Sequence, residues 1–341
     1  MGREYLTSKD KEEIFKTSNY INYEKYMKSK RVKGISERSL TTYYSYFTHF
    51  LKFLHDHDRF TDIDLYSDEF YDNAVDIMED FMAYLQEDCG LHKKVINTKI
   101  SAVSSFFEWS VKRKIIKAHP FAGKLDRMKN AKDEKIRKPQ WLTQEQIDTV
   151  KRELQTNNKY DLQDQVLFSL VIDSGNRVGA IHQITLSKLN VDEMVVEDII
   201  EKGNKNVEIV FEDEDTQDLI REWLDARKDG YDRLTVDALF ITYYKNEWKP
   251  MSYGTIQSRF SKIGKDILGL ERFGMHDGRK TKANLLYEET GDLTMAQRWL
   301  NHNDVSTTLS HYIKPASKAD LRNSVREKRA LKEKQIKELK E

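Results

Sequence analysis

Residues 194–211 read MVVEDIIEKGNKNVEIVF, and this stretch predicts two strands joined by a short turn. Apolar residues alternate at Val207, Ile209 and Phe211, which is the period-two pattern of a strand with one buried face. The glycine and asparagine of the KGNK sequence favour a turn between the strands. We expect extended segments at 194–196, 198–201 and 207–211, with residues 202–205 as the turn.

Around this stretch the sequence predicts helices. Residues 36–54, SERSLTTYYSYFTHFLKFL, repeat apolar side chains at helical spacing, and Ser36 precedes them as an N-cap. The expected fold class is therefore mainly α with a small antiparallel β-sheet. Further helices are expected at 71–85 and 95–114, after the N-cap Thr143, at 161–173, after Gly175, and at 215–226, 253–268, 277–289 and 292–300.

The length of 341 residues is too great for one ordinary hydrophobic core and suggests two domains. Residues 128–141, MKNAKDEKIRKPQW, are charged and contain a proline, as an exposed linker does. We therefore expect a helical domain at 1–135 and a mixed α/β, mostly helical domain at 136–317. The tail 318–341 carries nine basic and five acidic residues and a thin apolar stripe, which predicts either a partner-binding helix or a solvated one.

Charge is balanced overall but segregated along the chain. Lys+Arg and Asp+Glu both number 57, which excludes a uniformly basic DNA-coating protein. Residues 61–90 hold ten acidic and no basic side chains, whereas 91–140 hold fourteen basic and four acidic ones. The basic segment is either a solvated face or a DNA-binding surface. Its candidate DNA contacts are Lys94, Thr98, Lys99, Lys112, Arg113 and Lys114.

Cysteine use and hydropathy predict a cytoplasmic protein. Cys89 is the only cysteine, so no internal disulfide can form. No apolar run reaches the roughly 18 residues of a membrane span, and the first residues, MGREYLTSKDKEEIF, are charged where a signal peptide is apolar. No membrane partner is expected.

The sequence lacks the usual nucleotide and metal motifs. It contains no GxxxxGK[ST], no GxGxxG opening a helix, no HExxH and no Cys or His pair at zinc spacing. We therefore expect no cofactor and no metal ion. What remains is a polar set in the second domain: Arg177 in SGNRVGAI, Lys202 in EKGNKNV, His276 and Arg279 in MHDGR, His302 in LNH and Tyr312 in TTLSHYI.

Taken together and in this order, these motifs resemble those of the tyrosine recombinases, the phage-integrase and Xer-like site-specific recombinases. The segment GDLTMAQRWLNHNDVSTTLSHY, residues 291–312, is similar to the family over its whole length, and the resemblance covers residues 20–315. It implies a helical core DNA-binding domain followed by a tyrosine recombinase catalytic domain. Two positions depart from the family pattern. Ala180 stands where many members have Glu, and Asn301 stands where the family motif LGH has its Gly.

The chemistry of phosphodiester cleavage suits these residue types. Without a metal, cations must stabilise the charge that builds on the nonbridging phosphate oxygens, and arginine offers a planar, permanently charged fork. Arg177 and Arg279 are the expected clamp. Tyr312 is the expected nucleophile, and because a phenol has a pKa near about 10 it needs a base. His276, three residues before Arg279, is the candidate base.

The remaining residues complete the expected site. The departing 5′ oxygen needs a proton, and Lys202 is the candidate general acid, with Lys205 as the second choice. His302 can donate a hydrogen bond to the phosphate. Each residue taken alone also has an ordinary structural interpretation. An arginine can be a surface ion-pair partner, a lysine can lie in an exposed turn, a histidine can cap a turn or helix, and a tyrosine can be a packing anchor.

The resemblance implies a site-specific DNA recombinase of the integrase or transposase kind that forms a 3′-phosphotyrosyl intermediate. Its partners would be double-stranded DNA with a specific recombination site and three further copies of the chain, as a homotetramer on DNA. Alternatives that share the chemistry are a telomere resolvase and a type IB topoisomerase. A third alternative is a catalytically silent DNA-binding regulator, against which the complete polar set argues.

Overall fold

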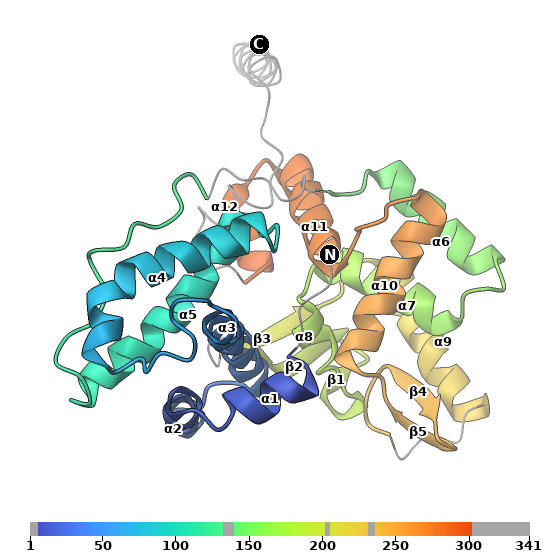
Figure 1. The fold of residues 1–341 in the computed structure, drawn as a ribbon. Helices are drawn as coiled ribbons and strands as arrows, with labels where there is room; N and C mark the ends of the chain where they lie inside the picture. Colours follow the sequence, from blue (N-terminus) through green and yellow to red (C-terminus); the bar gives the residue numbers. More distant parts are fainter. Residues whose placement is uncertain (1–5, 132–139, 202–204, 231–235, 302–341) are drawn as a thin grey trace, which may run out of the picture. The chain divides into compact units, whose positions relative to one another are not determined.

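The structure is a computed structural model that describes residues 6–131, 140–201, 205–230 and 236–301 (Figure 1). The chain divides into two compact units, residues 1–138 and 139–341. This division falls within the charged segment 128–141. The mainly helical composition and the small antiparallel sheets confirm the expected fold class.

The first unit is a helical domain built around aromatic side chains. Tyr23 stacks on Phe47 with ring centroids 3.9 Å apart, and the ring of Phe106 lies 4.9 Å from that of Phe47. All three are almost completely buried, so the aromatic residues of the predicted helices form core, as such residues usually do. The helices are α1 (Ser8–Ile14), α2 (Ser18–Val32), α3 (Glu37–His55), α4 (Asp68–Glu87) and α5 (Lys93–Lys112).

The predicted cap of α3 is present. The Ser36 side chain accepts a hydrogen bond from the Ser39 backbone N–H at 3.3 Å, satisfying one of the donors that a helix start leaves free. Helices α1 and α2 were not predicted. The helix α5 packs against α2, α3 and α4, and these contacts bury much of its surface.

The second unit is organised around α7 (Leu162–Ser174), whose residues 163–174 are buried apart from the half-buried Gln165. A helix that is buried on all sides must be covered by several partners, and α7 contacts α6, α9, α10 and α11. The other helices are α6 (Gln144–Thr156), α8 (Val178–Ile181), the 3₁₀ turn η1 (Leu186–Lys188), α9 (Glu214–Gly230), α10 (Tyr253–Leu268), α11 (Met275–Thr290) and α12 (Leu293–Trp299).

The predicted pair of strands is an antiparallel hairpin. The strands β1 (Leu189–Asn190), β2 (Val195–Glu201) and β3 (Lys205–Val210) form one sheet in that order. The register shifts between Val196 and Ile199, and Asp198 has φ +57°. This bulge explains why the extended pattern of the sequence is interrupted after residue 196.

A second hairpin was not predicted. The strands β4 (Ile241–Tyr244) and β5 (Glu247–Pro250) pair antiparallel. Their turn uses Lys245 and Asn246, both with positive φ, in place of the glycine that usually marks such a turn. Among the helices of the described ranges, none is long and apolar enough to cross a membrane.

Candidate active site

The end of α7 positions the first candidate catalytic residue, Arg177. Gly175 is the C-cap of α7 and has φ +63°, a left-handed conformation that favours glycine. A Cβ atom at this position would lie 2.7 Å from Leu300 Cδ2 and 3.1 Å from Lys282 Cβ. The glycine of the SGNR motif is therefore required both by the turn and by the close approach of α11 and the end of α12.

Arg279 joins the end of α7 to the end of α12. Its side chain is 1% exposed, Nη1 donates to the Gly175 carbonyl oxygen at 2.9 Å, and Nη2 donates to the Leu300 carbonyl oxygen. Trp299 adds a second link, because its indole N–H donates to the Ser174 carbonyl oxygen at 3.2 Å. The loop that leads into Arg177 is thus held by residues more than 100 positions later in the chain.

Glycine also sets how closely α11 approaches its neighbours. A Cβ atom at Gly278 would lie 2.7 Å from Val171 Cγ1 and 3.0 Å from Phe260 Cζ. The glycine of the HDGR motif therefore lets the start of α11 pack directly on α7 and α10. This packing carries His276 and Arg279 to the end of α7.

A buried ion pair reinforces the same junction. Lys282 Nζ lies 3.4 Å from Asp173 Oδ1 and 4.7 Å from the centre of the Trp299 ring. Asp173 Oδ2 also accepts from the backbone N–H of Glu212 at 3.0 Å. Burial raises the pKa of Asp173, and the Lys282 ammonium opposes that rise. The pair connects α7, α11 and the segment that follows β3.

His276 lies in the first turn of α11, and its pKa is lowered. The surrounding protein partly desolvates the imidazolium, although the residue is exposed to solvent, and the cations Lys280, Arg279 and Arg177 repel it. The nearby carboxylate of Asp277 opposes these effects. The lowered pKa favours the neutral imidazole, which is the form that can accept a proton.

Arg177 is the N-cap residue of α8, and its side chain makes no capping hydrogen bond. Its Nη1 donates instead to Glu201 Oε2 at the end of β2. The Arg177 side chain is 40% exposed, whereas that of Glu201 is 5% exposed. Arg177 can therefore keep this ion pair and still meet a ligand from solvent.

The structure brings together three of the six predicted catalytic residues. Arg279 donates to the Gly175 carbonyl oxygen at the end of α7. Arg177 follows two residues later as the N-cap of α8, and His276 lies in the same turn of α11 as Arg279. Lys202, His302 and Tyr312 lie outside the described residues. Lys205, the alternative acid, begins β3 and pairs with Glu201 across the hairpin.

The departure at position 301 has a structural explanation. Asn301 follows α12 and has φ +53°. Asparagine is the residue that, after glycine, most readily adopts this left-handed conformation. Asn301 therefore preserves the backbone turn that the Gly of LGH would make.

The predicted DNA contacts lie in the first unit, and one of them is not placed as expected. Lys94, Thr98 and residues 112–114 are exposed. Lys99 is only 7% exposed, and its Nζ lies 2.8 Å from His49 Nδ1 and 4.7 Å from the centre of the Tyr46 ring. Lys99 is therefore buried inside the domain and not on the surface where a DNA contact was expected, because α3 supplies polar and aromatic partners for its ammonium.

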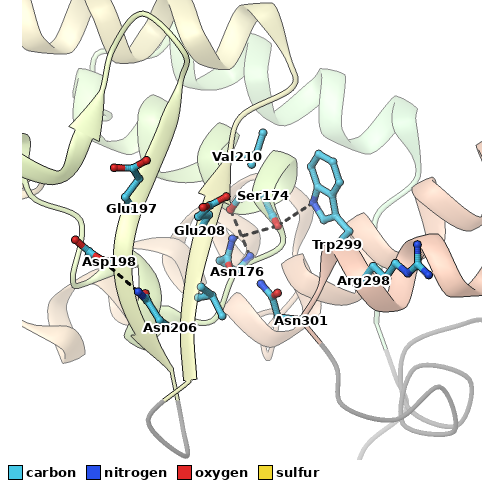
Figure 2. Close-up of a pocket in the computed structure, with 11 residues that line it drawn as sticks. Ser174, Asn176, Glu197, Asp198, Asn206, Glu208, Val210, Arg298, Trp299 and Asn301 are labelled. Atoms are coloured by element: carbon cyan, nitrogen blue, oxygen red, sulfur yellow. Dashed lines mark hydrogen bonds between the residues drawn. The ribbon is translucent and has the colours of Figure 1, made fainter.

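A cavity of about 620 Å³ lies next to the candidate site (Figure 2). Glu197, Asp198 and Glu208 on the hairpin face it, whereas Arg298 is its only basic lining residue in the described chain. Carboxylates repel phosphate, so the described lining of this cavity does not favour DNA binding. Its other lining residues are Ser174, Asn176, Asn206, Val207, Val210, Trp299 and Asn301.

Sequence reasoning missed Glu201 and Lys280 as neighbours of the candidate catalytic residues. Glu201 is the first residue of the EKGNKNV sequence and Lys280 follows the MHDGR motif, but no spacing rule indicated that Glu201 pairs with Arg177. The one signal in the sequence is Ala180, an apolar residue where a carboxylate is common. Within the described residues no group of three or more His, Cys, Asp or Glu side chains could hold a metal ion.

Comparison with known proteins identifies the family. Residues 140–319 match the phage integrase family, and residues 23–117 match the phage integrase N-terminal SAM-like domain. The tyrosine recombinase XerC of Corynebacterium glutamicum is 28% identical over 65% of this chain and 68% of its own length. The tyrosine recombinase XerD of Ralstonia nicotianae is 26% identical over 70% of this chain and 74% of its own length.

Solved structures share the fold at low sequence identity. The Tn1549 transposon integrase in complex with transposon right end DNA has a TM-score of 0.63 and 15% identity, covering 89% of this chain and 98% of its own. A lambda integrase dimer bound to a COC′ core site has a TM-score of 0.58 and 17% identity, covering 84% and 96%. The matched domains confirm the resemblance of the motifs: this chain belongs to the phage integrase family and is a tyrosine site-specific recombinase that cleaves and rejoins DNA.

Proposed function

We propose that Tyr312 is the nucleophile of this recombinase and that Arg177, Arg279 and His276 act on the same scissile phosphate. The observation that carries the proposal is that Arg279 donates to the Gly175 carbonyl oxygen at the end of α7, two residues before Arg177, while His276 lies in the same turn of α11 as Arg279. Arginine side chains stabilise the charge that develops on nonbridging oxygens. A neutral imidazole accepts the proton of the phenol.

In the proposed cleavage step one bond to phosphorus forms while another breaks. The Tyr312 oxygen bonds to phosphorus as its proton passes to His276, and the bond from phosphorus to the 5′ oxygen breaks. Lys202 gives a proton to that oxygen, with Lys205 as the alternative donor, and His302 donates a hydrogen bond to the phosphate. The products are a 3′-phosphotyrosyl bond and a 5′-hydroxyl, and attack by a 5′-hydroxyl reverses the step and rejoins DNA.

The DNA partner is proposed to be a duplex with a specific recombination site. The first unit, as the core DNA-binding domain of residues 1–135, would contact phosphates through Lys94, Thr98 and residues 112–114, which are exposed. The second domain, residues 136–317, would carry the chemistry. Support comes from fold relatives that were solved on transposon right end DNA and on a core site.

A homotetramer on DNA is the proposed assembly. Exchange of strands between two duplexes requires four cleavage events, and the related lambda integrase was solved as a tetramer bound to a Holliday junction. The tail 318–341 is proposed to link neighbouring protomers. A cytoplasmic location belongs to the same proposal and rests on the sequence alone.

A covalent-complex assay tests the nucleophile. Duplexes enriched by the full chain from a random-sequence library define a binding site, and a nicked, labelled suicide duplex built on that site traps the intermediate. The wild-type chain should give a covalent band on a denaturing gel, and Tyr312→Phe should bind the duplex equally well without forming the band. A covalent band from Tyr312→Phe would place the nucleophile elsewhere.

A further inference from the structure

Glu201 is a buried carboxylate at the point where β2 leads into the KGNK sequence. Its Oε2 accepts from Arg177 Nη1, and its Oε1 is buried without a hydrogen-bond partner among the residues that the structure describes. Burying a carboxylate costs free energy that a single partner offsets only in part. Stability alone therefore gives a poor account of this residue, and its contact with a candidate catalytic arginine gives a better one.

The backbone next to Glu201 is fixed to the same helix as Arg177. The side chain of Gln183 accepts from the Ile200 N–H at 3.1 Å and donates to the Ile200 carbonyl oxygen at 2.9 Å. The same amide nitrogen donates to the Gly179 carbonyl oxygen within α8 at 2.8 Å. The hydrogen bonds of Gln183 thus fix the backbone of β2 one residue before Glu201, the residue whose side chain contacts Arg177.

Arg177 needs such a partner to hold one orientation. Its side chain is 40% exposed and makes no capping bond to its own helix, and a long exposed arginine samples many rotamers. Position 180, one helical turn later, is a buried alanine and offers no carboxylate. Glu201 contacts the guanidinium through Nη1 only, so the remaining N–H groups stay free of Glu201 and can meet a phosphate.

We propose that Glu201 is a positioning residue for the recombination reaction, a carboxylate on the hairpin that orients Arg177 toward the scissile phosphate. The inference rests on the proposed role of Arg177 and adds a group that touches neither DNA nor the reacting atoms. It predicts that loss of Glu201 slows cleavage only while Arg177 is present.

A double-mutant cycle on the suicide duplex tests this dependence. Glu201→Gln keeps the shape of the side chain and removes its charge, and misplacement of a catalytic group costs up to about a hundredfold in rate. We expect single-turnover formation of the covalent complex to fall about tenfold to a hundredfold, with the Kd for the duplex changed less than about twofold. In the Arg177→Ala background the same substitution should change the rate less than about twofold, because it then has no arginine to orient.

A second substrate gives an independent readout. A methylphosphonate at the scissile position removes one nonbridging charge, so the clamp matters less and the gap between wild type and Glu201→Gln should shrink to about threefold or less. A 5′-phosphorothiolate, whose sulfur leaves without a proton, should leave that gap unchanged. Glu197→Gln, which removes an exposed carboxylate from the same strand, serves as the matched control and should behave as wild type.

The outcomes separate this inference from the proposal on which it rests. Absence of a Tyr312-dependent covalent band from the wild type would remove the proposed function itself. With that band present, an equal loss of rate in both Arg177 backgrounds overturns the inference. Faster cleavage by Glu201→Gln also overturns it, because Glu201 would then compete with phosphate for Arg177. Rescue of Glu201→Gln by the phosphorothiolate would show instead that Glu201 supports the general acid Lys202. Thermal unfolding of each variant checks that the chain is folded.

Discussion

Arg279 Nη1 lies 2.9 Å from the carbonyl oxygen of Gly175, the residue at which α7 ends. The same guanidinium also donates to Leu300, so one buried side chain satisfies two carbonyl groups at the ends of two helices. This arrangement gives Arg279 a structural role in addition to its proposed role at the phosphate. Its two roles can be measured separately.

Replacement of Arg279 by lysine should lower stability even though charge is kept. A lysine has one nitrogen and cannot reproduce both ends of the fork, so one buried carbonyl loses its donor, at a cost of about 1–3 kcal/mol. Urea unfolding of the full chain measures this loss. Arg298→Lys, a matched change at an exposed arginine, should unfold at the wild-type urea concentration, and an unchanged midpoint for Arg279→Lys would contradict the bridging role.

Gly175→Ala should destabilise the chain more than the same substitution at Gly269. Both glycines end helices with positive φ, +63° and +67°, but only Gly175 has neighbours where a Cβ atom would lie. Gly269→Ala should cost the backbone strain of about 1–2 kcal/mol, and Gly175→Ala should add about 1–3 kcal/mol of overpacking against Leu300 and Lys282. Equal urea midpoints for the two variants would show that the contact around Gly175 relaxes freely.

The rate of covalent-complex formation should depend on the ionisation of His276. Because its pKa is lowered below about 6.5, the base stays neutral in mildly acidic buffer, and the rate should fall only as the pH drops through this lower value. His276→Gln should cut the rate by about a hundredfold and abolish that acidic limb, whereas His182→Gln, at an exposed histidine, should keep it. An acidic limb that survives in His276→Gln would belong to another group.

The same pKa shift has a consequence for folding. A histidine whose pKa is lower in the folded state binds fewer protons there than in the unfolded chain, so between the two pKa values the free energy of unfolding decreases as the pH falls. His276→Gln should remove this contribution. Urea unfolding at neutral and at mildly acidic pH compares the two chains, and an identical pH dependence would contradict the shift.

Lys94 and Lys99 should differ in their effects on DNA binding. Lys94 is exposed, so Lys94→Ala should weaken binding to specific and random duplexes alike and reduce the salt slope by about one. Lys99→Ala should leave the slope unchanged and lower the urea midpoint, because it removes the ammonium that contacts His49 and Tyr46 inside the domain. A salt slope that changes with Lys99→Ala would place that lysine on DNA after all.

Patterns along the chain predicted the elements that local chemistry determines. Ser36 caps α3 as expected, and alternation at Val207 and Ile209 correctly predicted β3. The hairpin β4–β5 escaped notice because Lys245 and Asn246 make its turn without glycine. Periodicity assigns a residue to one side of a helix, but it contains no information about the neighbouring helix, which is why the burial of Lys99 against α3 was not predicted.

In the candidate site, too, sequence patterns predicted which residues belong to the site but not which residues contact one another across the fold. The order of motifs predicted that Arg177, His276 and Arg279 belong together, and in the structure Arg279 contacts the backbone two residues before Arg177 while His276 lies in the same turn of α11 as Arg279. The contact between Arg177 and Glu201 joins residues 24 positions apart through the folding of a strand onto α8, and no spacing rule describes it. The roles of Lys202, His302 and Tyr312 stay predictions.

The links at the end of α7 have a consequence for synthesis of the protein. Gly175 depends on a partner 104 residues later, and Ser174 on one 125 residues later. On the ribosome, therefore, residues 174–177 emerge long before the side chains that hold them, and the end of α7 can take up its final arrangement only after Trp299 has been synthesised. A chain terminated before residue 279 lacks both links, so the loop that carries Arg177 has neither of these supports.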